Sequence, residues 1–171
     1  MKTISYVTTN IDKFNKAKVN LATYNILLLH ETLEMDEPQT SDGDKIVRQK
    51  AEQAYEYFKK PVLVNDDTWS IPALRGFPGT GMKLCNDFLI AEDWLRLMEG
   101  KSDRRIQLVS YFAYHDGKTI QVVSAKDERR ILYEVRGIHK KSPCLEVIAH
   151  ADRTISMAEE IALGRKRDEN N

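Results

Sequence analysis

The stretch that decides the fold is Pro61-Val-Leu-Val-Asn-Asp-Asp-Thr-Trp-Ser-Ile-Pro-Ala-Leu-Arg-Gly-Phe-Pro-Gly79, near the middle of a chain of 171 residues. Its short apolar run after a proline is typical of a central strand, which we predict over Val62–Asn65. Asp66 and Asp67 then follow at the carboxyl end of that strand, the end that faces the ligand crevice in open α/β sheets. Carboxylates placed there can hold a divalent cation or activate a water. Taken alone, a polar turn after a strand is the simpler interpretation.

The first half of the chain alternates strands and helices. Apolar residues recur there at helical or strand spacing, which predicts strand Thr3–Thr8, helix Ile11–Thr23, strand Asn25–His30, helix Asp44–Lys59 and strand Val62–Asn65. Alternation of this kind implies parallel strands joined by right-handed crossovers.

The second half is richer in strands. We predict a helix over Lys83–Met98, with apolar residues spaced for burial at Leu84, Phe88, Ala91, Leu95 and Met98. Strands are expected at Ile106–His115, Thr119–Ala125 and Arg130–Arg136, with a hairpin turn at Asp116-Gly117. We therefore expect an α/β fold, a single domain over residues 1–171, with a long mixed β-sheet, flanking helices and two lobes around a groove.

The turn Thr8-Thr9-Asn10 joins the first strand to the first helix. Free N–H groups and the helix dipole make such a turn a ready site for phosphate. Thr8 and Asn10 supply donors, and Lys13 adds a positive charge one turn into the helix. The simpler interpretation is an ordinary helix cap, because Thr and Asn are common at that position.

The composition of the chain argues against several classes of function. The formal net charge is zero, so nothing favours a general binder of nucleic acid or of anionic membranes. The two cysteines, Cys85 and Cys144, lie far apart in the sequence and have no metal-binding spacing. No apolar run approaches the length of a membrane span and no secretory leader is recognisable, so we expect a cytoplasmic protein.

Several motifs in order resemble the inosine triphosphate pyrophosphatase family, hydrolases of non-canonical purine nucleoside triphosphates. The first is Thr8-x-Asn10-x-x-Lys13. Next come Glu37-x-Gln39 and Arg48-Gln-Lys50-Ala-x-x-Ala54, and then Pro61-Val-Leu-Val-x-Asp66 with Ala73-Leu-x-Gly76-x-Pro78-Gly79. The resemblance covers roughly residues 3 to 100.

The resemblance implies a Mg²⁺-dependent nucleoside triphosphate pyrophosphatase that releases a nucleoside monophosphate and pyrophosphate. Glu37 and Asp66 are the implied metal ligands, and Asp66, or a water that it holds, is the general base. Lys13 and Lys50 would clamp phosphates beside Thr8 and Asn10. The resemblance also implies a homodimer.

Two further residues complete the predicted site. Lys83 lies where the family has a basic residue after the Pro-Gly loop. Trp69 flanks that loop and could stack on a base, although burial in the core is the commoner fate of such a ring.

The chain departs from the family pattern in two places. Asn65 stands where the family usually has the first acid of a Glu-Asp pair. Asp67 can compensate only if the strand ends before it, because neighbouring side chains on a strand point to opposite faces. In addition, the family's aromatic-Gly-aromatic-Asp-Pro segment corresponds to Gly137–Leu145, where Pro143 fits, and no Ser-His-Arg motif is present. We therefore expect broad or shifted base preference.

Two other functions remain open on this sequence. A non-catalytic nucleotide-binding or regulatory protein on the same fold would also explain Asn65. A nucleosidase that uses Asp66 or Asp67 as a nucleophile would release free base and need no metal. Release of pyrophosphate from a panel of nucleotides separates the pyrophosphatase from the non-catalytic protein, and release of free base would identify the nucleosidase.

Overall fold

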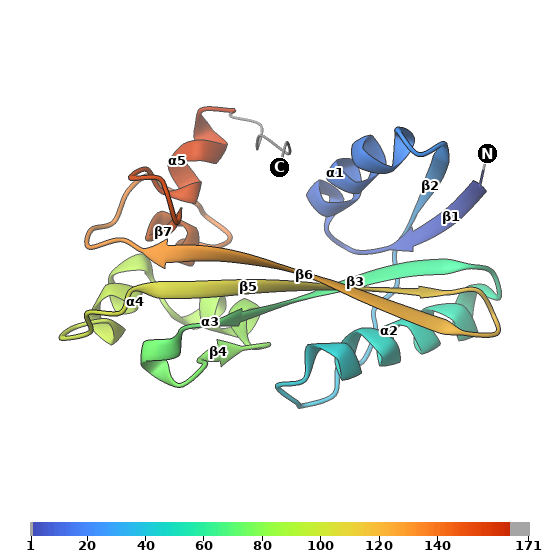
Figure 1. The fold of residues 1–171 in the computed structure, drawn as a ribbon, viewed down its shortest axis with the longest axis horizontal. Coiled ribbons are helices and arrows are strands. Elements are labelled where there is room, and N and C mark those ends of the chain that lie inside the picture. The colour runs from blue at the N-terminus through green and yellow to red at the C-terminus, as the bar shows by residue number, and fades with distance from the viewer. Residues whose placement is uncertain (1, 165–171) are drawn as a thin grey trace. The chain divides into compact units, whose positions relative to one another are not determined.

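The computed structural model describes residues 2–164 and confirms the predicted α/β class (Figure 1). The strands are β1 (Lys2–Val7), β2 (Ile26–Glu31), β3 (Val62–Ser70), β4 (Pro78–Gly79), β5 (Arg105–His115), β6 (Ile120–Ile131) and β7 (Ile148–His150). The helices are α1 (Ile11–Ala22), α2 (Gly43–Phe58), α3 (Met82–Phe88), α4 (Ala91–Leu97) and α5 (Met157–Ala162), with short 3-10 turns at Pro72–Leu74 and Pro143–Glu146.

The strands form one mixed sheet in the order β2-β1-β3-β5-β6-β7, with β4 paired to β3. Parallel pairing of β1 with β2 and with β3 confirms the parallel strands expected from the alternation of elements. The chain divides into two compact units, one of residues 1–67 and 110–125 and one of residues 68–109 and 126–171. Of the described residues, no helix is long and apolar enough to cross a membrane.

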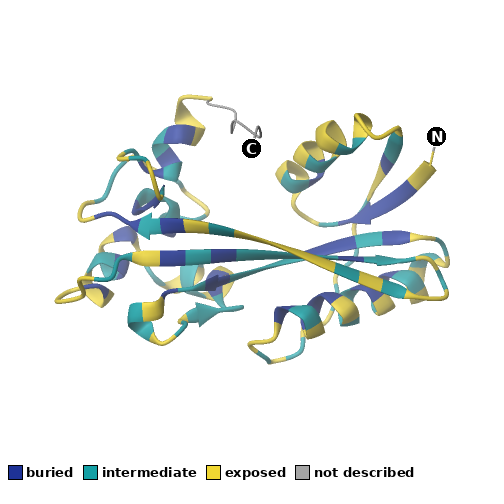
Figure 2. Cartoon of the chain, viewed as in Figure 1, coloured by how far each residue is buried: buried dark blue, intermediate teal, exposed yellow. Residues whose placement is uncertain are grey.

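The first unit has a helix on each face of its strands, α1 on one and α2 on the other (Figure 1). The alternation of side chains along β1 explains this arrangement. Tyr6 packs with Phe14 of α1, whereas its neighbour Val7 packs with Val47 and Ala51 of α2. In Figure 2 the inner side of α2 and the last four residues of β1 are buried, while the outer side of α2 faces solvent.

The second unit has its own apolar core. Trp94 of α4 belongs to this core and is 1% exposed. Side chains from β5, β6 and β7 complete this core, with Ile106, Ile131 and Ile148 nearly or fully buried.

Two element predictions in the second half are wrong. The helix expected over Lys83–Met98 is two helices, because Leu89 and Ile90 have extended backbone and the Asp93 carboxylate accepts a hydrogen bond from the Ile90 N–H, which starts α4 anew. As a result Leu84 and Phe88, expected to be buried, are 61% and 78% exposed.

The strand expected at Arg130–Arg136 does not form. Instead β6 continues without a break to Ile131, and the chain then turns away. The Arg104 guanidinium holds this turn by donating hydrogen bonds to the carbonyl oxygens of Ile131 and Leu132.

Candidate active site

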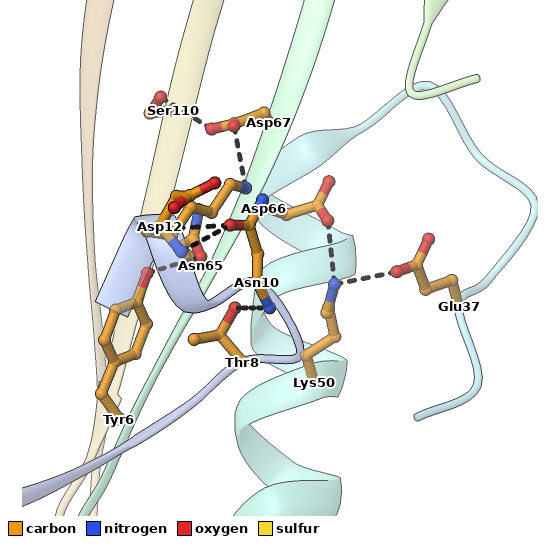
Figure 3. A network of polar contacts seen from close by, with 11 residues as sticks. Tyr6, Thr8, Asn10, Asp12, Glu37, Lys50, Asn65, Asp66, Asp67 and Ser110 are labelled. Atoms are coloured by element: carbon orange, nitrogen blue, oxygen red, sulfur yellow. Dashed lines mark hydrogen bonds and ion pairs between the residues drawn. The ribbon is translucent and has the colours of Figure 1, made fainter. Parts of the chain in front are cut away.

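The centre of the candidate site is Lys50, whose ammonium joins two carboxylates (Figure 3). Lys50 Nζ donates to Glu37 Oε1 at 2.8 Å and to Asp66 Oδ1 at 2.9 Å. Lys50 lies on α2, Asp66 on β3, and Glu37 on the irregular segment between β2 and α2. The structure therefore brings together three residues that the sequence predicted for one site.

Burial sets the electrostatics of this cluster. It raises the pKa of Asp66 above its ordinary value, and the opposing charge of Lys50 compensates only in part. For Lys50, burial alone would lower the pKa, yet Asp66 and Glu37 together hold the pKa above its ordinary value. A carboxylate with a raised pKa that stays beside a fixed cation is suited to take a proton from water.

Asp67 faces the other side of the strand. Its carboxylate pairs with Lys13 Nζ of α1 at 2.9 Å and accepts a hydrogen bond from Ser110 Oγ of β5 at 2.7 Å. The strand does not end before Asp67, because β3 continues to Ser70. The condition for Asp67 to join Asp66 on one face is therefore not met, and Asp67 instead anchors Lys13.

Asn65 is part of the layer between β3 and α1. Its side-chain oxygen accepts a hydrogen bond from the buried Tyr6 hydroxyl at 2.7 Å, and the residue is 8% exposed. Burial, with Asp67 nearby, raises the pKa of Tyr6, so the hydroxyl stays protonated and can donate. A neutral amide at position 65 thus completes a hydrogen bond in a layer that already contains Asp67.

The turn before α1 is held by its own side chains. Asn10 Oδ1 accepts from the N–H groups of Asp12 and Lys13 at 3.0 and 3.2 Å, and Thr8 Oγ1 accepts from the N–H of Asn10. His30 Nε2 donates to the Thr8 carbonyl at 2.9 Å. Asn10 is therefore a helix cap, as the simpler interpretation expected, and two N–H groups predicted to be free are bonded. Phosphate binding by Thr8 and Asn10 stays a prediction.

Trp69 and Lys83 belong to the second unit, so their place in the site also stays a prediction. Trp69 is 9% exposed within the core of that unit, and the guanidinium of Arg129 lies 5.2 Å from the centre of its ring. This burial favours packing over base stacking. Lys83 is exposed on α3.

The donor set suits a hard divalent cation. Glu37 and Asp66 each place an oxygen within 2.9 Å of a single cationic atom, Lys50 Nζ. Carboxylate oxygens are the ligands that Mg²⁺ prefers, and Mg²⁺ commonly takes one or two carboxylates together with substrate phosphates and waters. Within residues 2–164 no group of three or more His, Cys, Asp and Glu side chains is arranged to hold a metal, so phosphate oxygens and waters would complete the coordination.

Comparison with known proteins identifies the family of the chain. A model of the Ham1 family matches residues 4–159. The chain belongs to the Ham1 family. The "dITP/XTP pyrophosphatase" of Saccharolobus solfataricus is 31% identical over 134 residues, which cover 78% of this chain and 70% of that protein. The "Inosine triphosphate pyrophosphatase" of Tuber melanosporum is 32% identical over 116 residues, or 68% of this chain and 62% of that protein. The resemblance seen in the sequence is confirmed.

Solved structures show the Ham1 fold directly. A Ham1 protein from Coxiella burnetii superimposes with a TM-score of 0.76 at 18% identity, covering 93% of this chain and 87% of that one. The Ham1 protein of Staphylococcus aureus gives a TM-score of 0.74 at 19% identity, with 92% and 86% covered. The α/β fold with a mixed sheet predicted from the sequence is therefore that of the Ham1 family.

Two residues that hold parts of the candidate site gave no usable signal in the sequence. Ser110 lies within a strand of alternating pattern and was read as part of the sheet. Gln53 lies on α2 among other polar residues and donates to the carbonyl of Asp36, beside Glu37. Only the contacts made across the fold single out either residue.

Proposed function

We propose that this Ham1-family chain is a nucleoside triphosphate pyrophosphatase that hydrolyses NTP or dNTP, including non-canonical purine nucleotides, to the monophosphate and pyrophosphate. The observation that carries the proposal is the Glu37–Lys50–Asp66 cluster, in which the half-buried Asp66 carboxylate is held beside the Lys50 ammonium. Relatives named for hydrolysis of dITP, XTP and inosine triphosphate support the same reaction.

Each residue has a definite part in the proposed reaction. Asp66 takes the proton of the attacking water, because its pKa is raised and its carboxylate is oriented by Lys50. Lys50 and Lys13 contribute positive charge to the phosphates, with Thr8 and Asn10 at the turn before α1. Asp67, which accepts a hydrogen bond from Ser110, holds the Lys13 ammonium through an ion pair.

We further propose that Mg²⁺ is the cofactor and that Glu37 and Asp66 hold it. Bound there, Mg²⁺ would neutralise charge on the triphosphate and on the departing pyrophosphate. The Glu37–Lys50–Asp66 cluster and the Lys13–Asp67 pair together carry three carboxylates and two lysines. Their net charge is negative, so a polyanionic substrate needs an additional cation to bind. We also expect a homodimer, in the cytoplasm, without a nucleic-acid partner.

One observation favours a second function, a nucleotide-binding protein without catalysis. The amide of Asn65 is committed to Tyr6, so position 65 supplies no carboxylate. A panel of canonical and deaminated triphosphates, assayed for pyrophosphate with and without Mg²⁺, separates the two. Pyrophosphate release that depends on Mg²⁺ supports the enzyme. Binding of triphosphate without release would establish the second function instead.

A further inference from the structure

The segment that carries Glu37 has no regular secondary structure of its own. Residues 32–42 form neither helix nor strand between β2 and α2. Leu33 and Met35 pack against the apolar core below α2, which leaves the alternate residues Glu34 and Asp36 facing outward. The side chain of Glu37 is 54% exposed, and its carboxylate forms an ion pair with Lys50. Its position therefore depends on how the backbone beside it is held.

Gln53 of α2 holds that backbone with two hydrogen bonds. Its Nε2 donates to the Asp36 carbonyl at 2.7 Å, and its Oε1 accepts from the Asp36 N–H at 3.0 Å. The single side-chain amide of Gln53 thus satisfies both the N–H and the carbonyl of Asp36. A neighbouring β-strand would bond these two backbone groups in the same way. Asp36 directly precedes Glu37, and Gln53 lies on the same helix as Lys50, one turn further along.

From this geometry we propose that Gln53 is a positioning residue, which fixes the Asp36 backbone so that the Glu37 carboxylate faces Lys50 and Asp66. The inference rests on the proposed function, because the role assigned to Glu37 comes from it. Gln53 itself touches neither carboxylate. Its effect on the reaction passes entirely through Glu37.

The test compares Gln53→Ala with Gln49→Ala in the full chain. Gln49 is the same residue type on the same helix, half-buried, and the structure records no side-chain hydrogen bond for it. Alanine is the strongest helix former, so α2 is retained in both variants. We expect Gln53→Ala to lower kcat/KM for the triphosphate and to raise the Mg²⁺ concentration at half-maximal rate, each by about tenfold, since a small misplacement of a catalytic group is costly. Gln49→Ala should have the same kcat/KM and the same Mg²⁺ requirement as the parent.

Two further measurements make the test specific. In a Glu37→Gln background, Gln53→Ala should cause no additional loss, because the group through which it acts is already neutralised. Hydrogen exchange of the ligand-free protein should show faster exchange of the segment around Asp36 in Gln53→Ala and not in Gln49→Ala, whatever the activity.

Two results would overturn the proposal. One is a Gln53→Ala variant with the same kcat/KM, Mg²⁺ requirement and exchange as Gln49→Ala. The other is a full additional loss in the Glu37→Gln background, which would show that Gln53 acts elsewhere. A parent chain that releases no pyrophosphate would instead count against the proposed function, while the exchange measurement still decides whether Gln53 holds the segment.

Discussion

At the scale of single residues, the proposed reaction depends on Asp66 as its general base. It is the one carboxylate of the cluster that combines burial, a raised pKa and a direct bond to a lysine. Asp66→Asn removes the base and a metal ligand while keeping the shape of the side chain. We expect turnover to fall by at least about 10³-fold, with a thermal melt close to that of the parent. Pyrophosphate release and the melt, measured on one preparation, check both parts. Activity near that of the parent would remove Asp66 from the mechanism.

The charge of Lys50 opposes the effect of burial on the pKa of Asp66. Burial raises the pKa of Asp66, and Lys50 is the main group that lowers it again, so Lys50→Ala should raise that pKa further. The base must be deprotonated to act, so the acid limb of the pH profile of kcat/KM should move to higher pH. Lys13→Ala is the matched comparison, because Lys13 has the smallest effect on Asp66. Its acid limb should stay closer to that of the parent.

Both lysine variants also test the phosphate contacts. Each should weaken binding of a triphosphate far more than binding of a monophosphate, because the lost charge acts on the phosphate chain. Unchanged triphosphate affinity in both variants would show that the phosphate half of the site lies elsewhere.

At the scale of elements, the candidate site depends most on α2, because this helix carries both Lys50 and Gln53. It begins at a cap in which Asp42 Oδ1 accepts from the N–H groups of Asp44 and Lys45. Asp42→Ala should lower the free energy of unfolding by about 1 kcal/mol. Ser41→Ala, one residue outside the cap, should leave it nearly unchanged. Denaturant unfolding of the two variants checks the difference, and equal stability would show that the cap contributes nothing.

The predictions of helices and strands were right where the spacing of apolar residues is enough to define the element. In α2, Ile46, Val47, Ala51 and Ala54 repeat at helical spacing and all are buried. The helix predicted over Lys83–Met98 has the same spacing, yet two helices form. The hydrogen bond from Ile90 N–H to Asp93 stops one helix and starts another, and apolar spacing carries no information about it.

At the scale of the whole molecule, exposed apolar side chains support the expected homodimer. Leu84, Phe88 and Ile90 are 61%, 78% and 56% exposed on α3 and at the start of α4. Light scattering at micromolar concentration should report a dimer, and Phe88→Glu should shift it to monomer. Val19→Glu, on the exposed side of α1 at 70% exposure, is the control and should stay dimeric. A parent protein that is monomeric would contradict the prediction.

The preference for one base over another also depends on the whole molecule. A site that hydrogen-bonds a base edge discriminates strongly, because a wrong base leaves buried polar groups unpaired. The segment Gly137–Leu145 keeps Pro143 but lacks the aromatic-Gly-aromatic-Asp pattern. We expect the ratio of kcat/KM for ITP to that for GTP or ATP to stay below about 10². A larger ratio would show that other residues read the base.

The sequence by itself determined the order of strands and helices in the first half, the family, and the candidate residues Lys13, Glu37, Lys50 and Asp66. These features follow from local spacing and from motif order, both of which are written along the chain. The sequence did not determine which charged residues form ion pairs. Asp66 bonds Lys50 while its neighbour Asp67 bonds Lys13, because alternate side chains of β3 face α2 and α1.

Only the tertiary structure decided that β3 continues past both carboxylates, and that Asn65 turns to Tyr6. The same holds for Gln53, which meets Asp36 only after β2 and α2 have packed. These contacts join residues far apart in the sequence, and burial of the apolar cores brings them together. No local pattern encodes them, because their geometry exists only once the cores have formed.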